Sequence, residues 1–405
     1  MTSTAAGTLG FDQSRLARIE PYLQQRYLDS GLLPHCQLLI ARNGEIAHFS
    51  HQGSAREGGT AIDERSLFRI ASMTKPITSI AFMMLVEQGK VALDTPVHRI
   101  LPELRDLAVF AGGAYGNFET RPTAQPMRMI DLLRHTSGLT YGFQERTPVD
   151  AAYRELRLDR WHGGPTLDDF VAHLGKLPLE FSPGDEWNYS VSTDVLGAVI
   201  ERVSGQTLDT FFREQIFAPL GMDDTFFTVP ADKLHRLTDC YSMTPKGERV
   251  MYDRGAESGW AKQPTLLSGG GGLVSSSLDY HRFCTMCLNG GELDGVRIVS
   301  RKTIDLMTRN HLPNDSDLAA MSQSLFSETT NAGTGFGLGF AITKDVAKTL
   351  LPGSEGEYYW GGMFSTAFFI DPVERLHMVF MTQVSPSSAF TVRRELKTLI
   401  YSALT

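Results

Sequence analysis

The chain has 405 residues, with 38 Lys plus Arg against 46 Asp plus Glu, which gives a formal net charge of −8 at pH 7. This length suffices for two or three structural units around a large core, and 42% hydrophobic residues are typical of a globular protein. An acidic chain without a basic cluster is a poor nucleic-acid binder, since contacts with phosphates need a patch of Lys and Arg.

Residues 1–20 have neither the basic region nor the apolar region of a secretory signal. The apolar run over residues 77–86 is about half as long as the ~20 residues that a membrane span needs. We therefore expect a cytoplasmic protein that does not bind a membrane.

Apolar residues at helical spacing predict a helix over residues 14–30. Two alternating, β-rich runs follow at residues 36–41 and 45–50. The Asn43-Gly44 pair between them is a strong hairpin signal, because both turn positions favour positive φ. The N-terminal part is therefore predicted to be a helix followed by a β-hairpin.

The middle of the chain contains mainly helical patterns, for example over residues 192–203. Residues 106–128 lack periodicity and are predicted to form a long surface loop. Toward the C-terminus, residues 365–370 and 376–383 predict a second pair of strands, and a closing helix is expected over about 389–404.

Strands at both ends of the chain, joined by hairpins, predict an α+β fold with one antiparallel sheet that both ends build and that helices flank. A mainly helical domain is inserted between the two halves of this sheet. The expected division is an α/β domain of residues 1–95 and 265–405 and a mainly helical domain of residues 96–264.

The first candidate for chemistry is the segment Ser72-Met-Thr-Lys75. Pro76 has no N–H and is tolerated only in the first turn of a helix, so the apolar helix that follows begins close to Ser72. A spacing of three places the Ser72 hydroxyl and the Lys75 amine on one face. A serine becomes nucleophilic when a base takes its proton, and a lysine serves as that base only where burial disfavours its ammonium form. Taken alone, the pattern is more often a serine cap followed by a solvated lysine.

Three further segments accompany this pair in the chain. They are HTSGLTY at residues 135–141, YSV at residues 189–191 and WGGM at residues 360–363. Together with Ser72, Lys75 and the glycine-rich runs at 269–273 and 335–339, they resemble the serine β-lactamase and penicillin-binding-protein superfamily. Within it the chain is most similar to the family VIII carboxylesterases, relatives of the class C β-lactamases, and the resemblance spans about residues 68–383.

The resemblance implies a class C β-lactamase-like fold with the active site in the cleft between the two domains. It implies that Ser72 is the acylated nucleophile and that Lys75 and Tyr189 form its proton relay. The backbone N–H groups of Ser72 and Met363 would form the oxyanion hole. The residues expected to bind the substrate are Trp360, Gly361, Gly362 and Tyr141.

Two positions depart from the β-lactamase pattern. Val191 stands where the Tyr-x-Asn motif has its amide, and Trp360-Gly361-Gly362 replaces Lys-Thr-Gly. Without the lysine cation and the threonine hydroxyl of that motif, the site binds an antibiotic carboxylate more weakly. The segment instead forms an apolar wall suited to neutral esters. We therefore expect a carboxylesterase that cleaves small, short-chain esters through an acyl-enzyme, with weak β-lactam hydrolysis as a side activity.

The alternatives are an acyltransferase of the same superfamily, a β-lactamase or D-amino-acid peptidase, and a catalytically silent binding protein. A substrate panel separates the enzymes, and an intact Ser72, Lys75 and Tyr189 argue against the silent binder. The sequence leaves the natural ester and the oligomeric state open.

Other motifs favour structural roles. His135 is expected to hydrogen-bond a buried loop rather than join a Ser-His-Asp triad. Cys284-Thr-Met-Cys287 lacks further ligands at compatible spacing, so both thiols are predicted to pack in the core. The glycine run at 269–272 lacks the Gly-Lys-Ser/Thr of a P-loop and predicts a tight backbone crossing. No G-x-S-x-G occurs, and neither a metal nor an organic cofactor is expected.

Overall fold

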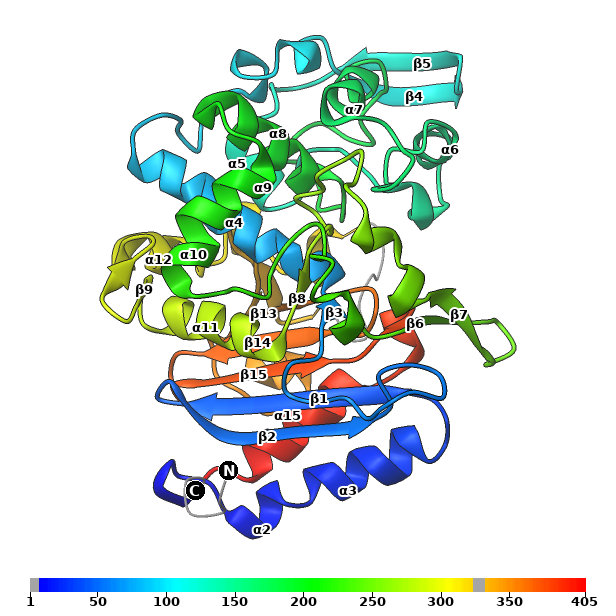
Figure 1. The fold of residues 1–405 in the computed structure, drawn as a ribbon. Coiled ribbons are helices and arrows are strands. Elements are labelled where there is room, and N and C mark those ends of the chain that lie inside the picture. The colour runs from blue at the N-terminus through cyan, green and yellow to red at the C-terminus, as the bar shows by residue number, and fades with distance from the viewer. Residues whose placement is uncertain (1–6, 323–331) are drawn as a thin grey trace.

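The computed structural model describes residues 7–322 and 332–405. At its centre is a seven-stranded sheet. Its strands are β1 (His35–Arg42), β2 (Glu45–Gly53), β11 (Thr334–Phe336), β12 (Ala341–Thr343), β13 (Tyr358–Gly361), β14 (Ala367–Asp371) and β15 (Leu376–Met381). They lie in the order β11-β12-β13-β14-β15-β1-β2, and every neighbouring pair is antiparallel (Figure 1). The predicted antiparallel sheet built from both ends of the chain is confirmed.

β1 is the strand at which the two ends of the chain meet. Its Leu39 pairs with Val379 of β15 on one side and with Phe49 of β2 on the other. All of β1 except its last residue is buried, because the sheet is covered on both faces. At the hairpin turn Asn43 has a φ of 56° and Gly44 a φ of 83°, so the predicted turn is confirmed.

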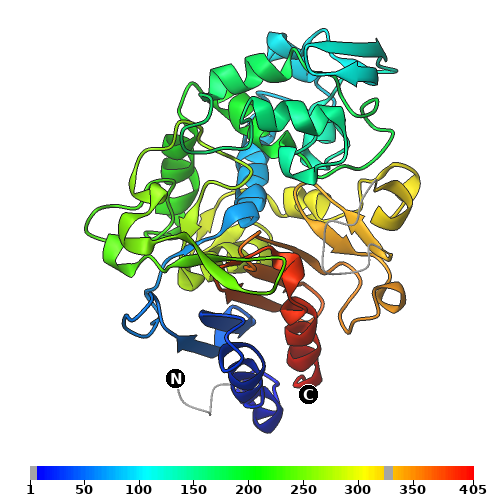
Figure 2. The same cartoon turned by 90° about the vertical axis from the view of Figure 1, so that its right-hand side faces the viewer.

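Helices from both ends of the chain cover one face of the sheet. They are α2 (Gln13–Leu16), α3 (Ile19–Leu23) with a π-helical turn after it (Gln24–Leu28), and α15 (Val392–Ser402), as Figure 2 shows. The single helix expected over residues 14–30 is therefore divided. Pro21 has no N–H to donate to Ala17, and it sits instead in the first turn of a new helix.

The other face of the sheet carries α11 (Ser277–Leu288), which contacts β1, β14 and β15. Beyond it runs α4 (Thr74–Glu87), whose residues are buried from Thr74 to Leu85. Gly89 follows with a φ of 68°, a left-handed conformation that ends the helix. The helical layer above the sheet in Figure 1 contains α5 (Met129–Leu133), α6 (Pro148–Glu155), α7 (Leu167–Leu174), α8 (Ser192–Ser204), α9 (Leu208–Phe212) and α10 (Ala218–Leu220).

The surface loop predicted over residues 106–128 is wrong. The segment forms a hairpin of β4 (Ala108–Ala114) and β5 (Asn117–Pro122), with Gly116 in the turn at a φ of 90°. Among these strand residues only Val109 is fully buried. A hairpin that buries neither face needs no alternation of apolar and polar residues, so the pattern that identifies a strand was absent.

Shorter elements complete the fold. They are β3 (Phe68–Arg69) paired with β8 (Val274–Ser275), β6 (Cys240–Met243) between β7 (Arg249–Asp253) and β16 (Val384–Ser385), β9 (Glu292–Leu293) with β10 (Val296–Arg297), and the helices α12 (Arg301–Met307), α13 (Leu318–Met321) and α14 (Val346–Thr349).

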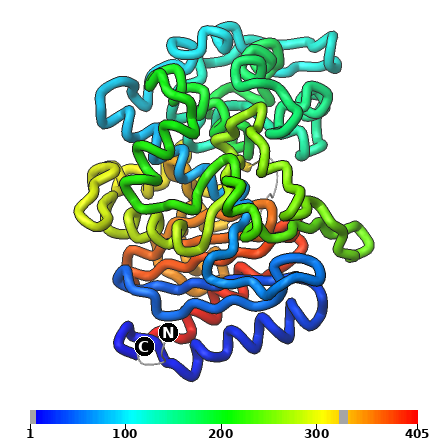
Figure 3. The backbone as a smooth tube through the Cα atoms, viewed as in Figure 1, coloured from blue at the N-terminus to red at the C-terminus, as the bar shows by residue number. Residues whose placement is uncertain are grey.

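The two ends of the described chain lie side by side (Figure 3). Phe11 forms a β-bridge with Leu404, and the amide of Thr405 donates to the carbonyl of Gly10 at 3.1 Å. Across residues 7–322 and 332–405, no helix has the length and apolarity that crossing a membrane requires.

Candidate active site

Ser72 and Lys75 lie where the chain enters α4. Ser72 occupies a 3-10 turn (Ala71–Met73), and Lys75 follows in the first turn of the helix. The Nζ atom of Lys75 lies 3.3 Å from Oγ of Ser72. Lys75 is only 2% exposed, which excludes the solvated lysine considered above. Ala71 adopts a φ of 43°, a strained conformation of the kind that concentrates at functional sites.

Two further acceptors surround the Lys75 nitrogen. It donates to the hydroxyl of Tyr141 at 3.0 Å and to the carbonyl of Gly270 at 2.7 Å. With Ser72, these acceptors place three oxygen atoms around the Lys75 nitrogen and hold it in place. Burial raises the pKa of the Tyr141 phenol well above its usual value, and the nearby Asp194 and Tyr189 raise it further. Tyr141, expected as a substrate-binding residue, therefore also contacts the predicted base directly.

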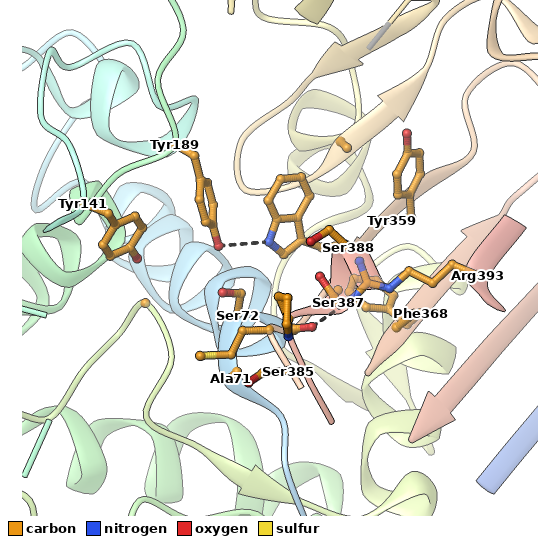
Figure 4. A pocket seen from close by; sticks show the side chains of 18 of the residues that line it. Ala71, Ser72, Tyr141, Tyr189, Tyr359, Phe368, Ser385, Ser387, Ser388 and Arg393 are labelled. Atoms are coloured by element: carbon orange, nitrogen blue, oxygen red, sulfur yellow. Dashed lines mark hydrogen bonds between the residues drawn. The ribbon is translucent and has the colours of Figure 1, made fainter. Parts of the chain in front are cut away.

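Tyr189 precedes α8 and points into the same pocket as Ser72 (Figure 4). The Lys75 nitrogen lies 4.5 Å from the centroid of the Tyr189 ring. The phenol oxygen accepts a hydrogen bond of 3.4 Å from the indole N–H of Trp360. The structure thus brings Ser72, Lys75, Tyr189 and Trp360 together from three distant parts of the sequence.

Asp194 is a buried residue of the site that the sequence analysis did not single out. Its carboxylate accepts hydrogen bonds from the Ser268 hydroxyl and from the Gly270 amide, the latter at 3.0 Å. Asp194 therefore holds the residue whose carbonyl accepts from Lys75. Burial raises the pKa of Asp194, and the charge of Lys75 partly offsets this rise. An acidic residue in the first turn of a helix is common, so the sequence carries no signal for this role.

Trp360 and Gly361 end β13 beside the turn that holds Ser72, and Gly362 follows them. A Cβ on Gly362 would lie 2.5 Å from the carbonyl oxygen of Ile70 and 2.3 Å from Oγ1 of Thr366, so only glycine fits. The Thr366 hydroxyl donates to the same Ile70 carbonyl at 3.4 Å. The strand end that carries Met363 is thereby held against the segment that carries Ser72.

These residues face a cavity of about 1080 Å³. Residues of the helical layer and of the end of β13 line the part beside Ser72, and the cavity continues between the sheet and α15, past Phe369 and Lys397. Lys75 is not among the lining residues, but its nitrogen bonds Ser72 and Tyr141, which both line the cavity. The predicted site residues that line the cavity are Ser72, Tyr141, Tyr189, Trp360, Gly361, Gly362 and Met363.

The remaining motifs have structural surroundings. The Nδ1 atom of His135 lies 3.2 Å from the Ser190 hydroxyl in a buried loop, and no hydrogen bond among the described residues joins His135 to Ser72. Cys284 and Cys287 are buried, unpaired thiols of the core. A Cβ on Gly269 would lie 2.7 Å from the carbonyl of Thr193, which confirms the tight crossing. The part of the chain that the structure describes contains no cluster of three metal-ligating side chains.

An antiparallel sheet under a helical layer, with a serine and a lysine at the start of a buried helix and a tyrosine beside them, defines the class of β-lactamase-fold serine hydrolases. The family model described as Beta-lactamase matches residues 23–401. The chain belongs to this family.

Similar proteins of known name agree with this assignment. Esterase EstB from Burkholderia gladioli is 32% identical over 369 residues, which cover 86% of this chain and 85% of the esterase. The solved structure of EstCE1, described as a hydrolase with promiscuous acyltransferase activity, aligns with a TM-score of 0.78 at 27% identity and covers 96% of this chain and 98% of its own. Simvastatin synthase (LovD) from Aspergillus terreus has a TM-score of 0.80 at 23% identity, with 96% and 98% covered, and supports the fold alone.

Proposed function

We propose that this chain is a family VIII-type carboxylesterase that hydrolyses short-chain esters through an acyl-enzyme on Ser72. The observation that carries the proposal is the 3.3 Å contact between a buried lysine nitrogen and the Ser72 hydroxyl in the wall of a large cavity. A base within hydrogen-bonding distance is the requirement for an activated serine.

In this mechanism Oγ of Ser72 attacks the ester carbonyl while its proton passes to the relay of Lys75 and Tyr189. The relay returns the proton to the leaving alcohol as the C–O bond breaks. The amides of Ser72 and Met363 stabilise the oxyanion. Water, deprotonated by the same relay, then releases the acid and frees Ser72.

The preference for neutral esters follows from the wall opposite the nucleophile. Trp360 presents an indole ring where β-lactamases carry a lysine, and its N–H is bonded to Tyr189. Val191 is buried and supplies no amide to the cavity. A ligand carboxylate therefore gains little from either position, which favours uncharged acyl groups over anionic β-lactams.

The test compares the wild-type protein with the Ser72→Ala variant on p-nitrophenyl esters of graded acyl length, with nitrocefin included. Release of p-nitrophenol is expected from the short esters and is abolished in Ser72→Ala. Ser30→Ala, which changes an exposed serine, is the matched control. Mass spectrometry after treatment with a fluorophosphonate is expected to show one adduct, on Ser72; an unmodified Ser72 or undiminished turnover by Ser72→Ala refutes the proposal.

A second candidate is transfer of the acyl group to an alcohol instead of water. It is favoured by the similarity to EstCE1, whose description includes acyltransferase activity. Product analysis in the presence of a competing alcohol measures the partition between hydrolysis and transfer.

A further inference from the structure

The carbonyl of the peptide unit between Gly362 and Met363 accepts two hydrogen bonds. In a trans peptide the C=O and N–H groups point in opposite directions. The Gly362 carbonyl accepts a hydrogen bond of 2.8 Å from Nη2 of Arg393, which also donates to the Thr366 carbonyl at 2.9 Å. Figure 4 labels Arg393 among the residues that line the pocket. The Ser365 amide donates to the same Gly362 carbonyl at 3.1 Å.

Gly361 provides the space that Arg393 occupies. A Cβ on Gly361 would lie 2.5 Å from Cζ of Arg393 and 2.7 Å from both of its terminal nitrogens. The guanidinium therefore lies directly on the backbone of the strand end. The two glycines leave space for different groups. The space beside Gly361 is occupied by the guanidinium, and the space beside Gly362 is occupied by the carbonyl of Ile70, on the side of the nucleophile.

We propose that Arg393 is a positioning residue of the oxyanion hole, an inference that rests on the proposed function. By anchoring the Gly362 carbonyl, Arg393 directs the Met363 N–H away from itself and toward the oxygen that becomes negative when Ser72 attacks. A guanidinium is charged at every relevant pH. Its hydrogen bond to the carbonyl also polarises the peptide, which strengthens the N–H at the other end as a donor.

This role differs from that of a residue that binds the substrate. An oxyanion donor acts mainly in the transition state, so its loss lowers kcat and leaves KM nearly unchanged. Removing an oxyanion donor outright costs about 10²–10³ in kcat. Misdirecting one is expected to cost somewhat less, and we expect kcat of Arg393→Met to fall about 10- to 100-fold, with KM within about twofold of the wild type.

The experiment measures kcat and KM on p-nitrophenyl butyrate for Arg393→Met, Arg393→Lys and Arg393→Ala. Arg393→Lys retains a charge but cannot reproduce the fixed planar donor geometry, and an intermediate kcat is expected. Added guanidinium ion is expected to restore part of the kcat of Arg393→Ala. Affinity for a boronic acid, which forms an anionic tetrahedral adduct on serine, is expected to fall by the same factor as kcat.

The control is Arg26→Met. Arg26 also contacts α15, through Glu395 at 3.8 Å, but lies among the N-terminal helices. Unchanged kcat in Arg26→Met shows that loosening of α15 is not the cause.

A variant of Arg393 that keeps its kcat but raises KM, or equal losses in Arg26→Met, overturns the inference. If Arg393→Met fails to fold, the Arg393→Lys variant tests the inference instead. A wild-type kcat in Arg393→Lys overturns the inference, and a lower kcat with an unchanged Tm supports it. Failure of the proposed function itself is seen separately, in a wild-type protein without esterase activity.

Discussion

The Nζ atom of Lys75 lies 3.3 Å from Oγ of Ser72, inside the first turn of a buried helix. In the proposed mechanism Ser72 loses its proton through this contact, so replacing Lys75 with Met is expected to lower kcat/KM at least about 10³-fold, at the upper end of what general-base catalysis supplies. The check is the initial rate on p-nitrophenyl acetate with circular dichroism to establish folding. The exposed Lys176→Met serves as the control, and esterase activity retained in Lys75→Met contradicts the relay.

Two tyrosines contact the lysine in different ways, and their phenylalanine variants separate their roles. Tyr189 carries its hydroxyl beside Trp360, whereas Tyr141 bonds the lysine nitrogen at 3.0 Å. We expect Tyr189→Phe to lose about 10²–10³ in kcat as part of the proton relay and Tyr141→Phe to lose about tenfold as a support of Lys75. Steady-state kinetics of both variants test this order, and the reverse order assigns the relay to Tyr141.

Gly362→Ala is expected to lower activity about 100-fold. The new methyl group would meet the Ile70 carbonyl at 2.5 Å, and backbone cannot yield as the tip of a side chain does, so the strand end must move away from Ser72. The measurement is kcat together with Tm. Gly112→Ala, where the nearest atom belongs to the flexible side chain of Glu119 on an exposed hairpin, is expected to leave kcat unchanged.

Stability is expected to fall in acid because of a histidine pair between α11 and β15. Nδ1 of His281 lies 2.8 Å from Nε2 of His377. Burial lowers the pKa of His281 to about 4 and lowers that of His377 well below its usual value. Both values lie below the unfolded value of about 6.5, so the unfolded chain binds more protons in between. The stabilisation is therefore complete above about pH 6.5 and is lost as the pH falls toward 4.

Urea unfolding between about pH 7.5 and pH 5 checks this dependence. For His281 alone the expected loss at pH 5 is on the order of 2 kcal/mol. A His281→Gln variant is expected to show a flatter profile but not a level one, because burial also lowers the pKa of His35 to about 4. An unchanged slope in His281→Gln excludes the pair as the source.

The sequence predicted the parts of the site whose chemistry is local. Ser72 and Lys75 are three residues apart on a helix, and Pro76 places the helix start, so their contact follows from helix geometry. The antiparallel sheet followed from alternation at both chain ends. By contrast, Asp194 and Arg393 contact the backbone of Gly270 and Gly362. A Cβ on Gly270 would lie 2.5 Å from the Asp194 carboxylate, so glycine is required there, but a glycine in the sequence does not show which distant side chain occupies the space.

The errors have physical causes too. The exposed hairpin of β4 and β5 lacks the apolar alternation from which strands are predicted. The N-terminal helix divides at a point that its apolar spacing does not reveal, although Pro21 gives a reason once the break is known. Trp360 and Tyr189 could be expected in one pocket, but the hydrogen bond between them depends on the packing of the whole helical layer on the sheet.

The pairing of β1 with β15 also constrains how the molecule reaches its final shape. Leu39 can pair with Val379 only after some 340 intervening residues have been synthesised. Until then β1, a strand whose residues are buried from His35 to Ala41, has one open edge, which exposes the nascent chain to aggregation. Such long-range closure is slow, and we expect the protein to depend on chaperones during synthesis more than a domain of the same size built from neighbouring segments.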